Sequence, residues 1–179
     1  VLSAVLDALS IETMHVSEGA LRTGVLYDLL GRVQQHDQRD ATVRVFMRRH
    51  HADHGQAERV HALADALLHQ LAPRVAADDA QMLRWAASLH EIGLMIAQTG
   101  YHKHSAYIVS NADMPGFSGS EQARLARLVL AHRGKLGKLE ALPAKSGDWL
   151  LVFALRIAAV MYRARVDFDL PAIESRTTD

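Results

Sequence analysis

Apolar residues recur with the period of an α-helix along most of this chain. Between residues 54 and 73 they fall three and four positions apart and form one face, which comprises Val60, Leu63, Ala64, Leu67, Leu68 and Leu71. Asp53, followed three positions later by Gln56, is typical of a capping box that opens such a helix, and Pro73 closes it. This segment is therefore expected to be a long helix with one buried side.

The same reasoning predicts three further helices downstream. Their starts are marked by two capping pairs and one breaker, namely Asp78 with Gln81, Ser118 with Glu121, and Ser146-Gly147. No run of alternating β-branched residues indicates a sheet in this region. The expected fold class is all-α, a multi-helix bundle over residues 41–170.

The first forty residues have a different pattern. A brief strand is expected over residues 11–16, followed by a helix from about Glu18 to Leu30 that Gly31 caps. A lone strand needs a partner for its backbone groups, so we interpret residues 1–31 as the tail of another domain. The polar residues 32–40 are expected to form a linker, and residues 171–179 a C-terminal tail. Because the chain opens at Val1 rather than Met, we expect it to be a piece of a longer protein.

Composition narrows the classes of partner. The 179 residues include 20 basic and 20 acidic side chains, so no overall field attracts nucleic acid, and any polyanion site must be a local patch. The chain has no cysteine, which fits a reducing compartment. No apolar run approaches the roughly 20 residues that span a bilayer. We therefore expect a cytoplasmic protein without a membrane span.

Histidines are the main candidates for chemistry. His90 shares a helix face with buried-type residues such as Leu83, and His132 does the same with Leu125. Two inward histidines with Glu91 can hold a metal ion, but they can equally be core residues hydrogen-bonded to the backbone. The triplet formed by His102, Lys103 and His104 is a solvated loop, a ligand cluster or a cradle for phosphate.

One helical pattern of metal ligands can be compared directly with this chain. Metal-dependent histidine–aspartate (HD) phosphohydrolases place an early His, a His-Asp pair and a late Asp on separate helices, where bound metal activates water. Here Gln56 stands at the early position, the pair reads His90-Glu91, and Ala159 occupies the late position. We therefore assign no catalytic residue. A phosphohydrolase that uses His90, Glu91 and His132 stays open as the alternative.

Several long strings resemble the exopolyphosphatase/guanosine pentaphosphate phosphatase (Ppx/GppA) family. They are MHVSEGALRTGVLYDLLGR (14–32), QAERV (56–60), WAASLHEIGL (85–94), GYHKHSAYIVSNADMPGFS (100–118) and LVLAHRGKL (128–136). The resemblance implies that this chain is the C-terminal helical domain, with a degenerate HD fold, behind two actin-like domains. Residues 1–31 would then end the second actin-like domain, and catalysis would take place in the part that precedes this chain.

The resemblance also implies a function for the intact protein. It would release terminal phosphate from polyphosphate or guanosine pentaphosphate with a divalent cation such as Mg²⁺, as a homodimer. The present chain would be inactive alone, would need no cofactor, and would bind the polyanion, mediate dimerisation or do both. Trp149 and Phe153 are expected in the core or in a dimer surface.

Basic side chains are the candidates for polyanion contact, because lysine and arginine neutralise phosphate charges. The candidate residues are Arg22, His102, Lys103, His104, Arg124, Arg127, Arg133, Lys135 and Lys138. A second basic group comprises Arg44, Arg48 and Arg49. The competing interpretation is that these charges form an ordinary solvated surface.

Overall fold

The described part of the chain is helical throughout. The computed structural model describes residues 37–139, 146–167 and 173, and within these ranges it has six α-helices, three short 3-10 helices and no strand. The chain divides into two compact units, Val1–Asp37 and Gln38–Asp179. The strand and helix expected within residues 1–31 lie outside the described residues, as do Arg22 and the side chain of Lys138. The all-α prediction is confirmed for the described ranges, and the expected domain boundaries stay predictions.

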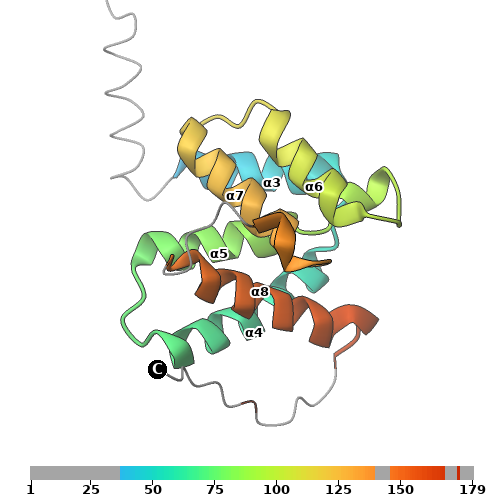
Figure 1. Ribbon diagram of the computed structural model, residues 1–179. Coiled ribbons are helices and arrows are strands. Elements are labelled where there is room, and N and C mark those ends of the chain that lie inside the picture. Colours follow the sequence, from blue (N-terminus) through green and yellow to red (C-terminus); the bar gives the residue numbers. More distant parts are fainter. Residues whose placement is uncertain (1–36, 140–145, 168–172, 174–179) are drawn as a thin grey trace, which may run out of the picture. The chain divides into compact units, whose positions relative to one another are not determined.

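Helix α5 (Ala77–Leu89) lies at the centre of the bundle (Figure 1). It contacts α3 (Gln38–Arg49), α4 (His54–Leu71), α7 (Gly119–Ala131) and α8 (Asp148–Met161). Neighbours on several sides explain why its buried residues lie around much of its circumference: Met82, Leu83, Trp85, Ala86, Ala87 and Leu89. The elements that follow α5 are therefore held against a rigid support.

Two pairs of helices pack on either side of this support. Helix α8 lies along α4, and α6 (Tyr101–Asn111) lies along α7 (Figure 1). The short helix η1 (Ile92–Met95) joins α5 to α6 and packs on α6. Leu67 of α4 and Leu155 of α8 are at most 1% exposed in a single shared core. Each such leucine contributes about 1.5–3 kcal/mol through burial.

Helix α3 begins inside the segment that we expected to be a linker. Asp40 accepts hydrogen bonds from the Trp85 indole Nε1 at 2.6 Å and from Gln81 Nε2 at 2.8 Å. Arg39 lies over the Trp85 ring and pairs with Glu121. These partners come from distant parts of the chain, so the polar sequence of residues 38–40 gave no sign of them.

The predicted capping boxes had different outcomes. At α7 both halves are present: Ser118 accepts from the Glu121 backbone N–H, and the Glu121 side chain accepts from the Ser118 N–H. At α4 Asp53 accepts from the Gln56 N–H, but the Gln56 side chain binds elsewhere. At α5 the prediction was wrong, because the N-cap is Ala76 and makes no side-chain bond. Asp78 instead lies in the first turn, where a carboxylate favours the helix dipole.

The remaining described elements are the short helices η2 (Leu136–Leu139) and η3 (Tyr162–Ala164), which flank α8 in the sequence. Of the helices in the described ranges, none has the length and apolar content needed to cross a membrane.

Candidate functional site

Two histidines occupy equivalent positions at the ends of two helices. His90 directly follows α5 and His132 directly follows α7, and both are at most 2% exposed. Each Nδ1 lies 2.6 Å from the carbonyl oxygen three residues earlier, Ala87 for His90 and Val129 for His132. A carbonyl only accepts, so Nδ1 carries the proton and Nε2 of the neutral ring is left as an acceptor. The backbone bonding that we considered in the sequence is therefore present at both histidines.

The two imidazoles meet inside the helical bundle. Their ring centroids are 5.1 Å apart and their planes are perpendicular, at 89°. The Tyr101 hydroxyl lies 3.3 Å from His132 Nε2, and the His102 ring lies 6.1 Å from the His132 ring. This histidine centre, which comprises His90, His102, His132 and Tyr101, brings together the ends of α5 and α7 and the start of α6.

The triplet His102, Lys103 and His104 is helical and not a loop. It forms the first turn of α6, where His102 is buried, Lys103 is exposed and His104 is partly buried. Only His102 therefore contributes to the histidine centre.

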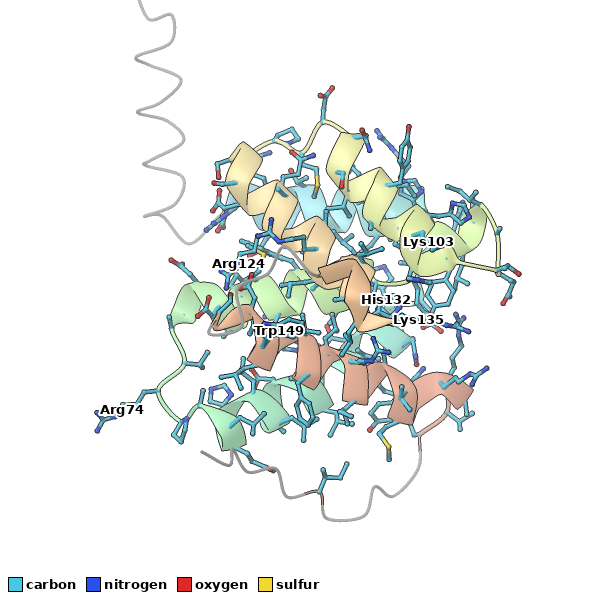
Figure 2. All side chains as sticks on the ribbon, in the orientation of Figure 1. Arg74, Lys103, Arg124, His132, Lys135 and Trp149 are labelled. Carbon is cyan, nitrogen blue, oxygen red and sulfur yellow. The ribbon has the colours of Figure 1, made fainter. Side chains whose placement is uncertain are left out.

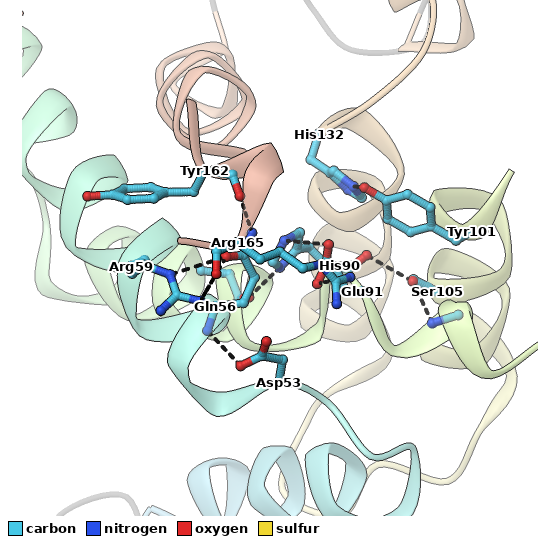
Figure 3. A network of polar contacts seen from close by, with 12 residues as sticks. Asp53, Gln56, Arg59, His90, Glu91, Tyr101, Ser105, His132, Tyr162 and Arg165 are labelled. Atoms are coloured by element: carbon cyan, nitrogen blue, oxygen red, sulfur yellow. Dashed lines mark hydrogen bonds and ion pairs between the residues drawn. The ribbon is translucent and has the colours of Figure 1, made fainter. Parts of the chain in front are cut away.

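Glu91 is paired with an arginine that the sequence did not single out. The Arg165 Nη2 atom donates to Glu91 Oε2 at 2.9 Å, while Glu91 Oε1 lies 3.9 Å from His90 Nε2 (Figure 3). Burial lowers the pKa of His90, against the opposing effects of Glu91 and the bond to Ala87. The ring is thus held in its neutral form.

Gln56 is buried at the position where the HD pattern has its early histidine. Its Nε2 donates to the Tyr162 carbonyl at 2.8 Å, and its Oε1 accepts from the Arg59 guanidinium. Arg59 in turn donates to the Arg165 carbonyl, as Figure 3 shows. Gln56 therefore ties the end of α8 to α4 through hydrogen bonds.

These contacts bear on the alternative of a metal-dependent site. In the described ranges no group of three His, Asp or Glu side chains is arranged to hold a metal ion. Glu91 is paired with a guanidinium, and Ala159 contributes only a methyl group. The donor set needed by an HD-type metal centre is therefore incomplete among the described residues.

The basic candidates divide into two places along α7. Arg124 bridges two carboxylates, Asp79 at 2.6 Å and Asp148 at 2.8 Å, and Arg127 lies 4.0 Å from Asp148. Arg133 and Lys135 follow the other end of the helix and are exposed; Lys135 is labelled in Figure 2. Arg124 is thus engaged by carboxylates within the protein, whereas Lys135 is an exposed cation.

The second basic group lies on α3. Arg44, Arg48 and Arg49 are exposed, and the Arg49 guanidinium lies 5.7 Å from the centre of the Phe46 ring. Arg44 lines a pocket that also contains Asp40 and Glu58, so acids accompany this group.

A small pocket opens beside the histidine centre. It has a volume of about 110 Å³ and is lined by Tyr101, His132, Arg133, Ala159, Val160 and Arg163. The Arg133 guanidinium lies 5.0 Å from the centre of the Tyr101 ring. We call this feature the Arg133–Arg163 pocket. Sequence reasoning singled out its members His132, Arg133 and Ala159 separately, but not Tyr101 or Arg163.

Comparison with known proteins identifies the family. The family described as Ppx/GppA phosphatase, domain III, matches residues 38–178. The chain is thus a helical domain of a phosphatase family, and it belongs to the Ppx/GppA phosphatases. These matches confirm the resemblance to this family that the sequence strings indicated.

Several similar proteins share the description guanosine-5'-triphosphate,3'-diphosphate pyrophosphatase. The protein of Pseudoalteromonas translucida (strain TAC 125) is 40% identical over 177 residues, covering 96% of this chain and 36% of that protein. The Aeromonas hydrophila protein is 38% identical, with coverage of 96% and 36%. The Vibrio cholerae O395 protein is 33% identical, with coverage of 97% and 36%. The chain therefore spans about a third of the length of these relatives.

Proposed function

We propose that this chain is the C-terminal accessory domain of an enzyme that releases terminal phosphate from guanosine pentaphosphate or polyphosphate. The observation that carries the proposal is the incomplete donor set beside the histidine centre: Glu91 is paired with Arg165, Gln56 is hydrogen-bonded to the Tyr162 carbonyl, and Ala159 offers only a methyl group. The family match to domain III supports an accessory place in a longer protein. The reacting groups would then belong to the part that precedes this chain.

The names of the relatives favour guanosine pentaphosphate as the substrate of the intact protein. A divalent cation such as Mg²⁺ belongs to this proposed activity, but the described residues do not supply a site for it. The cytoplasmic location and the degenerate HD ancestry stay predictions.

The first proposed role of the domain is contact with the polyanion. Lys103, Arg133 and Lys135 are exposed and support this role, whereas Arg124 is a weaker candidate because two carboxylates already neutralise it. Charged groups that follow a phosphate chain bind it largely by releasing its counterions.

The second proposed role is dimerisation, which the outer face of α8 supports. Phe153 is 43% exposed and Val160 is 62% exposed, on the side of the helix away from its buried face of Leu151, Val152, Ala154, Leu155 and Ala158. Light scattering with size-exclusion chromatography on the wild-type chain is expected to give a dimer mass. Phe153→Lys is expected to give a monomer, whereas Tyr107→Lys, at an exposed residue of α6, should leave the dimer intact. If the wild-type chain has a monomer mass even at high protein concentration, the proposed dimerisation role is wrong.

Phosphate release tests the assignment of catalysis. The chain alone, supplied with Mg²⁺ or Mn²⁺, is expected to release no phosphate from guanosine pentaphosphate or long-chain polyphosphate, whereas the intact protein is expected to release it. Metal-dependent release by the chain that disappears in His90→Ala would overturn the proposal and establish the metal-dependent alternative.

A further inference from the structure

We infer that the Arg133–Arg163 pocket binds one phosphate group. The pocket is built from elements far apart in the sequence: Tyr101 opens α6, His132 and Arg133 follow α7, Ala159 and Val160 end α8, and Arg163 lies in η3. Its volume of about 110 Å³ is several times the roughly 10–15 Å³ that a cavity needs to hold one water molecule. A single tetrahedral oxyanion is of this size class.

The charge of the lining favours an anion. Two of the six lining residues are arginines and none is acidic. The pocket over Trp85 differs, because Asp78 and Glu121 line it together with its arginines. In the described part of the chain, Arg163 has no ion-pair partner. The guanidinium of Arg163 is thus available to an external anion, unlike that of Arg124.

The two aromatic residues of the pocket hold its donors in place. Stacking on Tyr101 orients the Arg133 guanidinium at the pocket. His132 is fixed by its bond to the Val129 carbonyl, and the Tyr101 hydroxyl lies beside its Nε2. The phenolic O–H can donate to Nε2 or turn to a phosphate oxygen at the mouth.

Ala159 makes the pocket compatible with negative charge. At this position the HD pattern has a carboxylate, which would repel a phosphate and fill part of the space. The methyl group removes the charge and leaves room. A position that serves a cation in the metal-dependent pattern therefore lines an anion pocket in this chain.

This inference rests on the proposed function, because it says where one phosphate group of the polyanion is held on this domain. The test is an NMR titration of the whole chain with inorganic phosphate at constant ionic strength, with chloride as the replaced anion. Saturable shifts are expected at Tyr101, Arg133 and Arg163. Arg133→Gln and Arg163→Gln should each weaken binding about tenfold or more, since each removes a charge-assisted hydrogen bond.

Ala159 offers a matched pair of variants that separates charge from volume. Ala159→Asp is expected to weaken phosphate binding at least tenfold, while Ala159→Asn, of nearly the same size, should stay within about threefold of the wild type. Arg74→Gln is the control for general charge, because this arginine projects into solvent away from the pocket (Figure 2). Retained circular dichroism and thermal midpoint would show that each variant is folded.

The outcomes separate the pocket from the proposed function. Absence of saturable binding, or equal losses in Arg74→Gln and Arg163→Gln, overturns the pocket. Long-chain polyphosphate is titrated in parallel by calorimetry. If it binds with full affinity to Arg163→Gln and Ala159→Asp, the pocket is refuted while the polyanion role stands. Metal-dependent hydrolysis by the chain, with phosphate still in the pocket, would refute the proposed function alone.

Discussion

At the residue scale, His90 and His132 show that a buried histidine can have a structural role without binding a metal ion. Each follows the last turn of its helix and donates Nδ1–H to a carbonyl that has no partner within the helix. Buried carbonyls left without a donor cost free energy, so these two side chains complete the ends of α5 and α7. From their spacing in the sequence alone, the same residues could be interpreted as metal ligands.

The lowered pKa of His90 gives a dependence of stability on pH. Its ordinary value is 6.5, and burial lowers the folded-state pKa, so the unfolded chain takes up the proton first on acidification. This contribution to stability is complete above about pH 6.5 and is lost as the pH falls from there through the lowered folded-state pKa. We expect the free energy of unfolding, measured with urea between pH 8 and 5, to fall accordingly.

His90→Gln is expected to reduce the slope of the free energy of unfolding against pH. The reduction is at most about 1.4 kcal/mol per pH unit, the value for one proton. His50 and His61 keep a residual slope of the same sign, because burial lowers their pKa values too. An unchanged slope in the variant would show that His90 does not bind different numbers of protons in the two states.

Arg124 is expected to matter for stability more than for binding. Arg124→Met keeps the alkyl stem but leaves Asp148, whose side chain is 10% exposed, without its main donor, at a cost of about 1–3 kcal/mol. Arg127→Met, at a side chain that is 47% exposed, should cost less than about 1 kcal/mol. Urea unfolding of both variants measures the difference, and equal losses would contradict the bridging role.

At the element scale, the contact between η1 and α6 depends on one glycine. A Cβ at Gly93 would lie 2.3 Å from the Tyr101 carbonyl oxygen and 2.4 Å from the Ser105 nitrogen. The Gly93 N–H donates to Ser105 Oγ, which donates to the His90 carbonyl. Helix α6 thus packs on η1 through backbone atoms, and this close approach places Tyr101 and His102 at the histidine centre.

Gly93→Ala is therefore expected to lower the free energy of unfolding by about 3 kcal/mol or more, because backbone must move to relieve the overlap. Gly119→Ala is the matched control. Its Cβ would meet nothing within 4 Å, so it should be neutral or slightly stabilising in the first turn of α7. Thermal melts followed by circular dichroism measure both, and a mild effect at Gly93 would show that η1 can shift away from α6.

The helices could be predicted from sequence where their buried faces are apolar. Helix α8 and the long run of α4 have such faces. Helix α6 does not, because its buried positions 102, 105, 106 and 109 have helical spacing but include His102 and Ser105. Polar residues at buried positions hid the pattern, and the triplet at its start resembled a loop.

The candidate site was predictable only in part, for a related reason. The inward direction of His90 and His132 follows from the apolar faces they share. Arg165 reaches Glu91 from a left-handed backbone position, φ 58°, that no local signal in the sequence marks. Arg163 and Tyr101 join the pocket only because the start of α6 and the segment after α8 lie near each other.

At the scale of the whole molecule, balanced charge makes polyanion binding a local property. The sequence has equal numbers of acidic and basic residues, so long-range attraction is weak. Binding of long-chain polyphosphate would depend on a few exposed cations and the counterions they release.

We therefore expect the affinity for long-chain polyphosphate to fall linearly on a plot of log affinity against log salt. Arg133→Gln should reduce the slope by about 1, as for loss of one phosphate contact, and Arg124→Met should leave it unchanged. Calorimetric titrations at several salt concentrations give the slopes. Equal changes in slope for the two variants would mean that the ion pairs of Arg124 do not keep it from contacting phosphate.

The pairing of α4 with α8 has a consequence during synthesis. The apolar face of α4 leaves the ribosome early, but its main partner is made only after α5, α6 and α7. Until then the part of this face that α8 covers is open to water and to other nascent chains. A ribosome that stalls before α8 would therefore hold a chain that is ready for capture by chaperones and proteases.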